Sequence, residues 1–156
     1  VGTAGTGDQV LQRVRYFSSR AFPINAGICI VAKGTVTGTA GTKVAAVSVK
    51  AGVGAVTIAS ISFAAGETGT WAFLIYLFQV SESGSEQEGV VFNSKTTGGT
   101  VAANNLSSTS VNYTTLGSAT ATGQALIIQT RGNPANAADQ VASHVLHVSY
   151  IPPRPG

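Results

Sequence analysis

Residues 69–80, GTWAFLIYLFQV, contain the chain's single tryptophan and its longest apolar run. Side chains alternate between the two faces of a strand, so one face of this stretch would carry Trp71, Phe73, Ile75 and Leu77. The opposite face would carry Ala72, Leu74, Tyr76, Phe78 and Val80. Both faces are apolar, so a strand here needs two covers, the core of its own domain and something else.

The composition limits what the second cover can be. Charged residues make up 10% of the 156 residues, against roughly 25% in an ordinary globular domain, and 19 residues are glycine. The polar surface must therefore consist mainly of hydroxyl and amide groups. A chain with so few charges is poorly protected against association, which favours self-assembly. A neutral, loop-rich β domain that stays monomeric is the alternative.

Short stretches rich in β-branched residues alternate with glycines and small polar residues along the whole chain. They predict strands over 10–17, 28–40, 43–52, 56–66, 69–80, 87–95, 107–117, 124–131 and 144–152. Only residues 133–142 suggest a helical turn, because alanines follow Pro134. The pattern is typical of an all-β antiparallel sandwich or barrel. We expect a flexible arm over 1–9, one domain over 10–151 and an extended tail over 152–156.

No predicted helix is long enough to cover the second face of residues 69–80, which leaves another subunit as the cover. Aromatic residues are favoured and charges are depleted at the centres of subunit interfaces. We therefore predict that one set of side chains is shared between the core and a subunit interface: Trp71, Phe73, Ile75, Tyr76, Leu77 and Phe78.

The sequence lacks the usual motifs of catalysis and metal binding, since GxSxG, GxxxxGK[ST], HExxH and CxxC are all missing. His144 and His147 are three residues apart, which places them on opposite faces of a regular strand. We expect both to be structural, the alternative being a metal or anion site on a threefold axis. Glu82, Glu86 and Glu88 predict a solvated hairpin tip rather than a calcium loop. We thus predict no catalytic residue, no cofactor and no metal ligand, and a hydrolase would lack an acid/base pair.

Charge and cysteine content narrow the range of partners. The net charge is +3, but the basic residues are spread out and only Arg13, Arg15 and Arg20 form a local group, so we do not expect nucleic acid binding. No run approaches the roughly 20 apolar residues of a membrane helix, and no signal peptide is visible. Cys29 is alone, which excludes an internal disulfide, and its apolar neighbours predict that it is buried.

Three segments together resemble a known group of proteins. They are GETGTWAFLIYLFQV (66–80), QEGVVFNSK (87–95) and QALIIQTRGNPANAADQVASHVLHVSYI (124–151). Their order resembles the trimeric jelly-roll modules of tailed-bacteriophage structural proteins, which include capsid decoration proteins, head fibres and tail-fibre or tail-needle knobs. The resemblance extends over residues 56–151. It implies a jelly-roll-like sandwich of about eight strands in a noncatalytic homotrimer at the virion surface, assembled in the host cytoplasm.

Within this group the short segment before the first predicted strand favours the decoration type. Such a protein would bind the major capsid protein or another virion protein through its arm and basic strand, here Asp8, Arg13, Arg15 and Arg20. The alternative is a head-fibre or tail-fibre knob that binds a host-surface receptor or glycan. Tyr113 is the clearest aromatic candidate for such a contact.

Overall fold

The described part of the chain folds into ten β-strands. The computed structural model describes residues 2–4, 6–16, 25–51, 54–80, 86–112 and 126–154, and these contain no helix. The strands are β1 (Gly2–Ala4), β2 (Gln9–Tyr16), β3 (Gly27–Thr37), β4 (Lys43–Ala51), β5 (Gly54–Phe63), β6 (Gly69–Gln79), β7 (Glu86–Thr97), β8 (Thr100–Asn112), β9 (Leu126–Pro134) and β10 (Gln140–Ile151).

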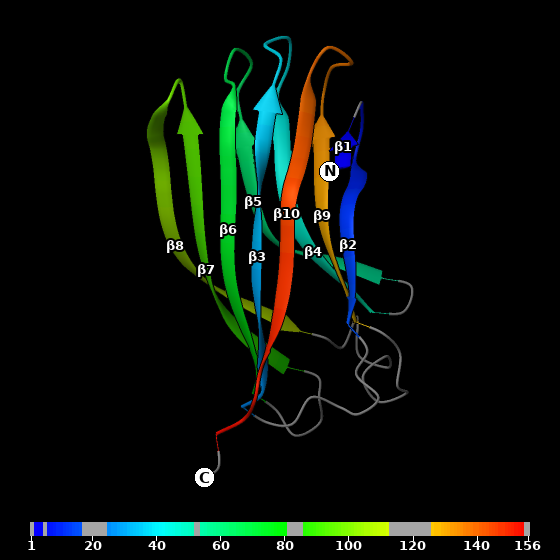
Figure 1. Cartoon of the computed structure of the whole chain (residues 1–156), viewed down its shortest axis with the longest axis vertical. Helices are drawn as coiled ribbons and strands as arrows, with labels where there is room; N and C mark the ends of the chain where they lie inside the picture. The colour runs from blue at the N-terminus through cyan, green and yellow to red at the C-terminus, as the bar shows by residue number, and fades with distance from the viewer. Residues whose placement is uncertain are drawn as a thin grey trace.

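The strands form two antiparallel sheets that lie one over the other (Figure 1). The large sheet has the order β1-β10-β3-β6-β7-β8 and the small sheet the order β2-β9-β4-β5. Every strand pair in both sheets is antiparallel. The predicted all-β antiparallel sandwich is therefore confirmed.

The pairing of the strands is nested in the manner of a jelly roll. Apart from the β7–β8 hairpin, eight strands remain, and they pair first with last and inward from there: β1 with β10, β2 with β9, β3 with β6 and β4 with β5. Rolling this ribbon up adds the pairs β10 with β3 and β9 with β4. The hairpin then extends the large sheet by two strands beyond β6.

Two local predictions differ from the structure. The arm predicted over 1–9 contains β1, in which Gly2 pairs with Ser143 of β10. The helical turn predicted over 133–142 is wrong: Asn133 and Pro134 end β9, a single turn follows, and β10 begins at residue 140. The side chain of Asn136 accepts a hydrogen bond from the Ala138 N–H (3.0 Å), a local bond that favours a turn over a helix.

The core lies between the sheets and contains the first face of β6. Trp71, Phe73, Ile75 and Leu77 are all buried there. The rings of Trp71 and Phe73 are 5.7 Å apart, within the range of favourable aromatic contacts. The other sheet contributes Ala45, Val47, Val49, Ile58, Ala59, Ile61, Phe63, Leu126 and Ile128.

Gly34 of β3 makes room for the tryptophan. Its register partner on β6 is Trp71, and both residues face the core. A Cβ atom at Gly34 would lie 1.8 Å from the carbonyl oxygen of Ala142 and 2.5 Å from the Trp71 ring. The glycine therefore allows β10 and the indole to approach β3 from two sides.

We expect Gly34→Ala to lower the free energy of unfolding by at least about 1–3 kcal/mol, because overpacking here displaces either backbone or the indole. Urea unfolding followed by tryptophan fluorescence measures this directly. Thr35→Ala is the matched control, since it removes only an exposed hydrogen bond to His144 and should cost less than about 1 kcal/mol. Equal losses in the two variants would contradict the packing role of Gly34.

Candidate interaction surface

The second face of β6 forms the centre of the outer surface of the large sheet. Leu74 pairs with Val31 of β3 and with Phe92 of β7. Tyr76 pairs in the same way with Cys29 and Val90. Because paired residues of neighbouring strands share a face, these partners form two rows across the sheet, all turned away from the core.

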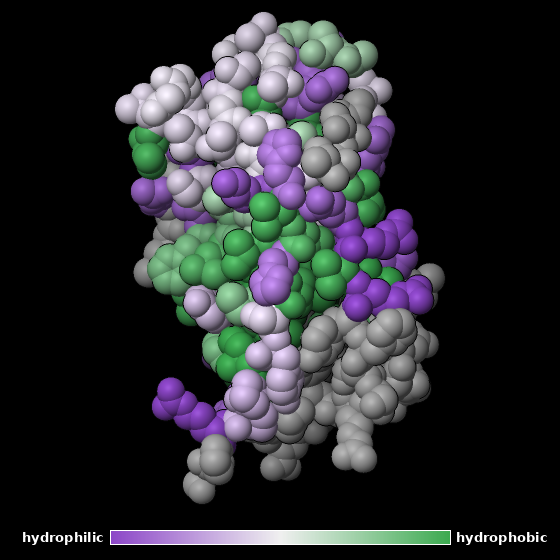
Figure 2. Space-filling view, in the orientation of Figure 1, coloured by the Kyte–Doolittle hydropathy of each residue, from purple (hydrophilic) through white to green (hydrophobic). Residues whose placement is uncertain are grey.

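Several large apolar side chains in and beside these rows are exposed. Their exposed fractions are 36% for Val31, 37% for Val145, 39% for Val90 and 43% for Phe92. Together with the half-buried Leu74 and Tyr76 they form what we call the apolar patch. Figure 2 shows hydrophobic residues gathered over the middle of this face, with more polar residues above them.

The patch is hollowed along β6. A groove of about 560 Å³ is lined by Val31, Lys33, Ala72, Leu74, Phe92 and Asn104, among others. Ala72 is small and stands between Lys33 of β3 and Ser94 of β7, which contributes to the hollow. The volume lies in the range of binding pockets for small molecules, but most of the exposed surface of the groove is apolar.

Two opposite charges lie at the borders of the patch. Lys33 of β3 pairs with Ala72 at one end of the apolar rows, and Glu88 of β7 pairs with Phe78 at the other end. Both side chains are exposed on the outer face. Neither has a hydrogen bond or an ion pair with another residue in the described part of the chain.

Both histidines lie on this outer face, which corrects the prediction that they lie on opposite faces. A β-bulge between Ser143 and Val145 places His144 outside the regular register of β10. Its Nε2 is 2.9 Å from Oγ1 of Thr35, on the outer side of β3. His147 pairs with Val31 and is exposed. One extra residue in the bulge cancels the alternation on which the prediction rested.

The residues predicted to be shared between the core and a subunit interface lie on two different faces of β6. Trp71, Phe73, Ile75 and Leu77 face the core, whereas Tyr76 and Phe78 face outward. The ring of Phe78 lies over its partner Gly27, where a Cβ atom would be 2.7 Å from Cδ1 of the ring. Cys29, predicted to be buried, is only half-buried because it lies on the outer face.

Two of the residues predicted to contact a capsid, Arg13 and Arg15, lie on the other side of the sandwich. Arg13 and Arg15 are exposed on the outer face of the small sheet, because their neighbours Val14 and Gln12 pair with the buried Ile128 and Thr130. Arg20 lies outside the described residues.

Asp8 is already engaged within the chain. Its carboxylate accepts two hydrogen bonds from Arg131, at 3.0 Å from Nε and 2.6 Å from Nη2. This bond raises the pKa of Arg131 above its ordinary value. The pair lines a pocket of about 270 Å³ with Thr57, Ser60 and Asn133. Sequence reasoning missed Arg131, since the two residues are more than 120 positions apart and only the fold brings them together.

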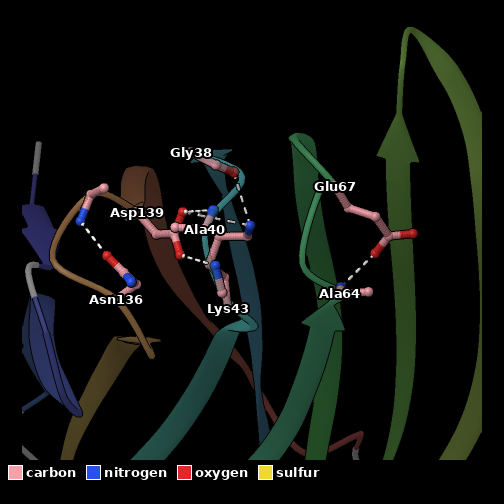
Figure 3. A network of polar contacts seen from close by, with 9 residues as sticks. Gly38, Ala40, Lys43, Ala64, Glu67, Asn136 and Asp139 are labelled. Atoms are coloured by element: carbon pink, nitrogen blue, oxygen red, sulfur yellow. Dashed lines mark hydrogen bonds and ion pairs between the residues drawn. The ribbon is translucent and has the colours of Figure 1, made fainter.

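A buried ion pair joins two loops at one end of the sandwich (Figure 3). The Asp139 carboxylate accepts hydrogen bonds from the N–H groups of Ala40 (3.0 Å) and Gly41 (2.7 Å). Lys43 lies 3.9 Å from this carboxylate and donates a hydrogen bond to the carbonyl of Gly38 (2.9 Å). Both charged side chains are fully buried. The pair is satisfied by its surroundings and acts as a structural clamp.

A second ion pair links the sheets near the edge of the large sheet. Lys95 of β7 contacts the Glu67 carboxylate, donates to the carbonyl of Ser62 (3.0 Å) and lies 4.8 Å from the centre of the Phe63 ring. The Glu67 carboxylate also accepts a hydrogen bond from the Ala64 N–H (2.7 Å, Figure 3). The bond from Lys95, and then that from Ala64, lowers the pKa of Glu67 below its ordinary value of 4.5.

The described residues were searched for metal sites and for membrane-spanning helices. No three His, Cys, Asp or Glu side chains among them come together to hold a metal ion. Within the same ranges no helix is both long and apolar enough to span a membrane. Glu88, predicted in a hairpin tip, lies instead within β7, whereas Glu82 and Tyr113 lie outside the described residues.

Comparison of the chain with protein-family models, with curated proteins and with solved structures found no match.

We expect Asp139→Ala to lower the free energy of unfolding by about 3–5 kcal/mol, because it leaves Lys43 buried without its counter-charge. Chemical denaturation at neutral pH measures the loss. The control is Asp8→Ala, which breaks a partly exposed ion pair and should cost at most about 1 kcal/mol. A small loss for Asp139→Ala would show that the loops rearrange without this clamp.

The lowered pKa of Glu67 predicts a pH dependence of stability. The folded state holds this proton less readily than the unfolded state, so the stabilisation is present above about pH 4.5 and is lost as the pH falls below that value. Glu67→Gln should therefore flatten the acid side of a plot of unfolding free energy against pH. A variant with the same acid slope as the unmodified chain would contradict this role.

Proposed function

We propose that this chain is a noncatalytic structural subunit of a bacteriophage virion that assembles with copies of itself, as a homotrimer, at the particle surface. The observation that carries the proposal is the apolar patch on the outer face of the large sheet. The resemblance to trimeric jelly-roll modules supplies the virion context. In this proposal, copies of the chain provide the second cover that residues 69–80 require.

The energetics of the patch favour an occupied surface. Burial of apolar area contributes roughly 25 cal/mol per Å², and the exposed Val31, Val90 and Phe92 lie beside the half-buried Leu74 and Tyr76. Soluble monomers rarely expose contiguous apolar areas larger than a few hundred Å². A contact that buries these neighbouring side chains would therefore be favourable.

The strand order supports the proposal but does not single it out. Jelly rolls form viral capsid domains, lectin domains and cupins, so the fold alone does not determine the function. Asp8, Glu67 and Asp139 are each engaged in ion pairs, and Glu88 stands on the outer face without a second carboxylate paired to it across the sheet. This arrangement favours a structural role over acid/base chemistry.

Two separate surfaces permit two kinds of contact. The apolar patch lies on the outer face of the large sheet, and Arg13 and Arg15 lie on the outer face of the small sheet. Copies of the chain would occupy the first surface, and the major capsid protein or another virion protein the second. A bound copy and a bound capsid would therefore not compete for the same residues.

Light scattering on the purified chain tests self-assembly, and we expect a mass of three times 15.7 kDa at micromolar concentration. The double variant Val31→Thr/Val90→Thr should shift this mass toward one chain, because it makes the patch polar while keeping β-branched residues of the same shape. Val101→Thr is the control: Val101 is 60% exposed, and its strand β8 lies at the edge of the same sheet.

Val101→Thr should leave the mass unchanged, and circular dichroism should show the same β signal in all three proteins. A mass of one chain for the unmodified protein would contradict the proposal. An unchanged mass for the double variant would place the contact on another surface.

A further inference from the structure

The two charges at the borders of the apolar patch are arranged in a self-complementary way. Lys33 lies on β3, on one side of β6, in the row of Ala72. Glu88 lies on β7, on the other side of β6, in the row of Phe78. The apolar rows of Leu74 and Tyr76 separate them, so they do not form an ion pair within one chain.

We propose that Lys33 of one copy pairs with Glu88 of a neighbouring copy, and that this pair fixes how the apolar patches meet. The inference rests on the proposed self-assembly and adds its register. Each copy carries both Lys33 and Glu88, one on each side of β6. The contact can therefore be reciprocal between two copies or run head to tail around a ring of three.

Pairing across the contact solves an electrostatic problem that assembly would otherwise create. A second copy placed on the patch removes water from the side chains at its border, and a charge that loses its hydration without a counter-charge is costly. Opposite charges at the two ends remove that cost only in the correct register. Apolar contacts do not fix the orientation of the bound copy, so the charges supply specificity as well as attraction.

The charge pattern also favours a second copy over a small ligand. An anionic amphiphile in the groove would use Lys33 for its head group and would leave Glu88 without a role. The groove runs beside Lys33 but is not lined by Glu88. Neighbouring copies of the same surface provide a counter-charge for both residues.

A charge-swap experiment tests the proposal on the full chain. Dissociation constants of the assembly are measured by sedimentation for Lys33→Glu, for Glu88→Lys and for the double variant K33E/E88K. Each single reversal should raise the dissociation constant at least about tenfold, because it sets like charges against each other. The double variant restores an opposite pair and should return to within about threefold of the unmodified chain.

Arg13→Glu is the control, because it reverses an exposed charge of the same kind on the small sheet. It should leave the dissociation constant unchanged. Single variants with an unchanged dissociation constant would overturn the Lys33–Glu88 pair while leaving self-assembly intact. A double variant that binds no more tightly than the single variants would do the same. An unmodified chain that stays a single chain in the same experiment would overturn the self-assembly and the pair together.

The competing occupant has its own readout. Laurate, a fatty acid with one carboxylate, is titrated into the unmodified chain and into Lys33→Glu. We expect no saturable binding to the assembled protein, since the copies cover the groove. Saturable binding that depends on Lys33 and dissociates the assembly would overturn the proposal and assign the groove to an anionic amphiphile.

Discussion

The antiparallel pairing of β3 with β6 is the constraint on which the rest of the structure depends. Ten consecutive residue pairs join the two strands, from Gly27 with Phe78 to Val36 with Gly69. Side chains alternate along both strands, so a slip of one residue would turn the core face outward. The close fit of Trp71 beside Gly34 opposes such a slip, because no other β3 residue in the core rows lacks a Cβ atom.

The same register that builds the core also builds the outer face. With Trp71 and Phe73 fixed inward, Leu74 and Tyr76 must point outward beside Val31 and Cys29. The apolar patch thus results from a strand that is hydrophobic on both faces. One face of the strand is buried in the core of the sandwich, and the other face is available for contacts between molecules.

Much of the fold could be predicted from local pattern, and the errors have physical causes. Nine of the ten described strands overlap a predicted strand, although β8 begins at Thr100 and not at residue 107. No strand is predicted at β1, because Gly2–Ala4 has little β propensity of its own and depends on pairing with β10. The prediction that His144 and His147 lie on opposite faces is wrong, because the sequence pattern does not reveal the β-bulge beside His144. The pairs Asp8–Arg131 and Lys43–Asp139 depend on the topology, which local pattern does not encode.

The β7–β8 hairpin is an addition to the eight nested strands of the jelly roll. Most core residues whose burial the structure describes lie on the eight nested strands, and β7 adds Val91. The same hairpin contributes Glu88, Val90 and Phe92 to the outer face. The hairpin therefore carries part of the recognition surface, and β3, β6 and β10 carry the rest beside their core residues. Evolution or design could replace the hairpin and change what the protein recognises, with the eight-strand roll kept as a reusable scaffold.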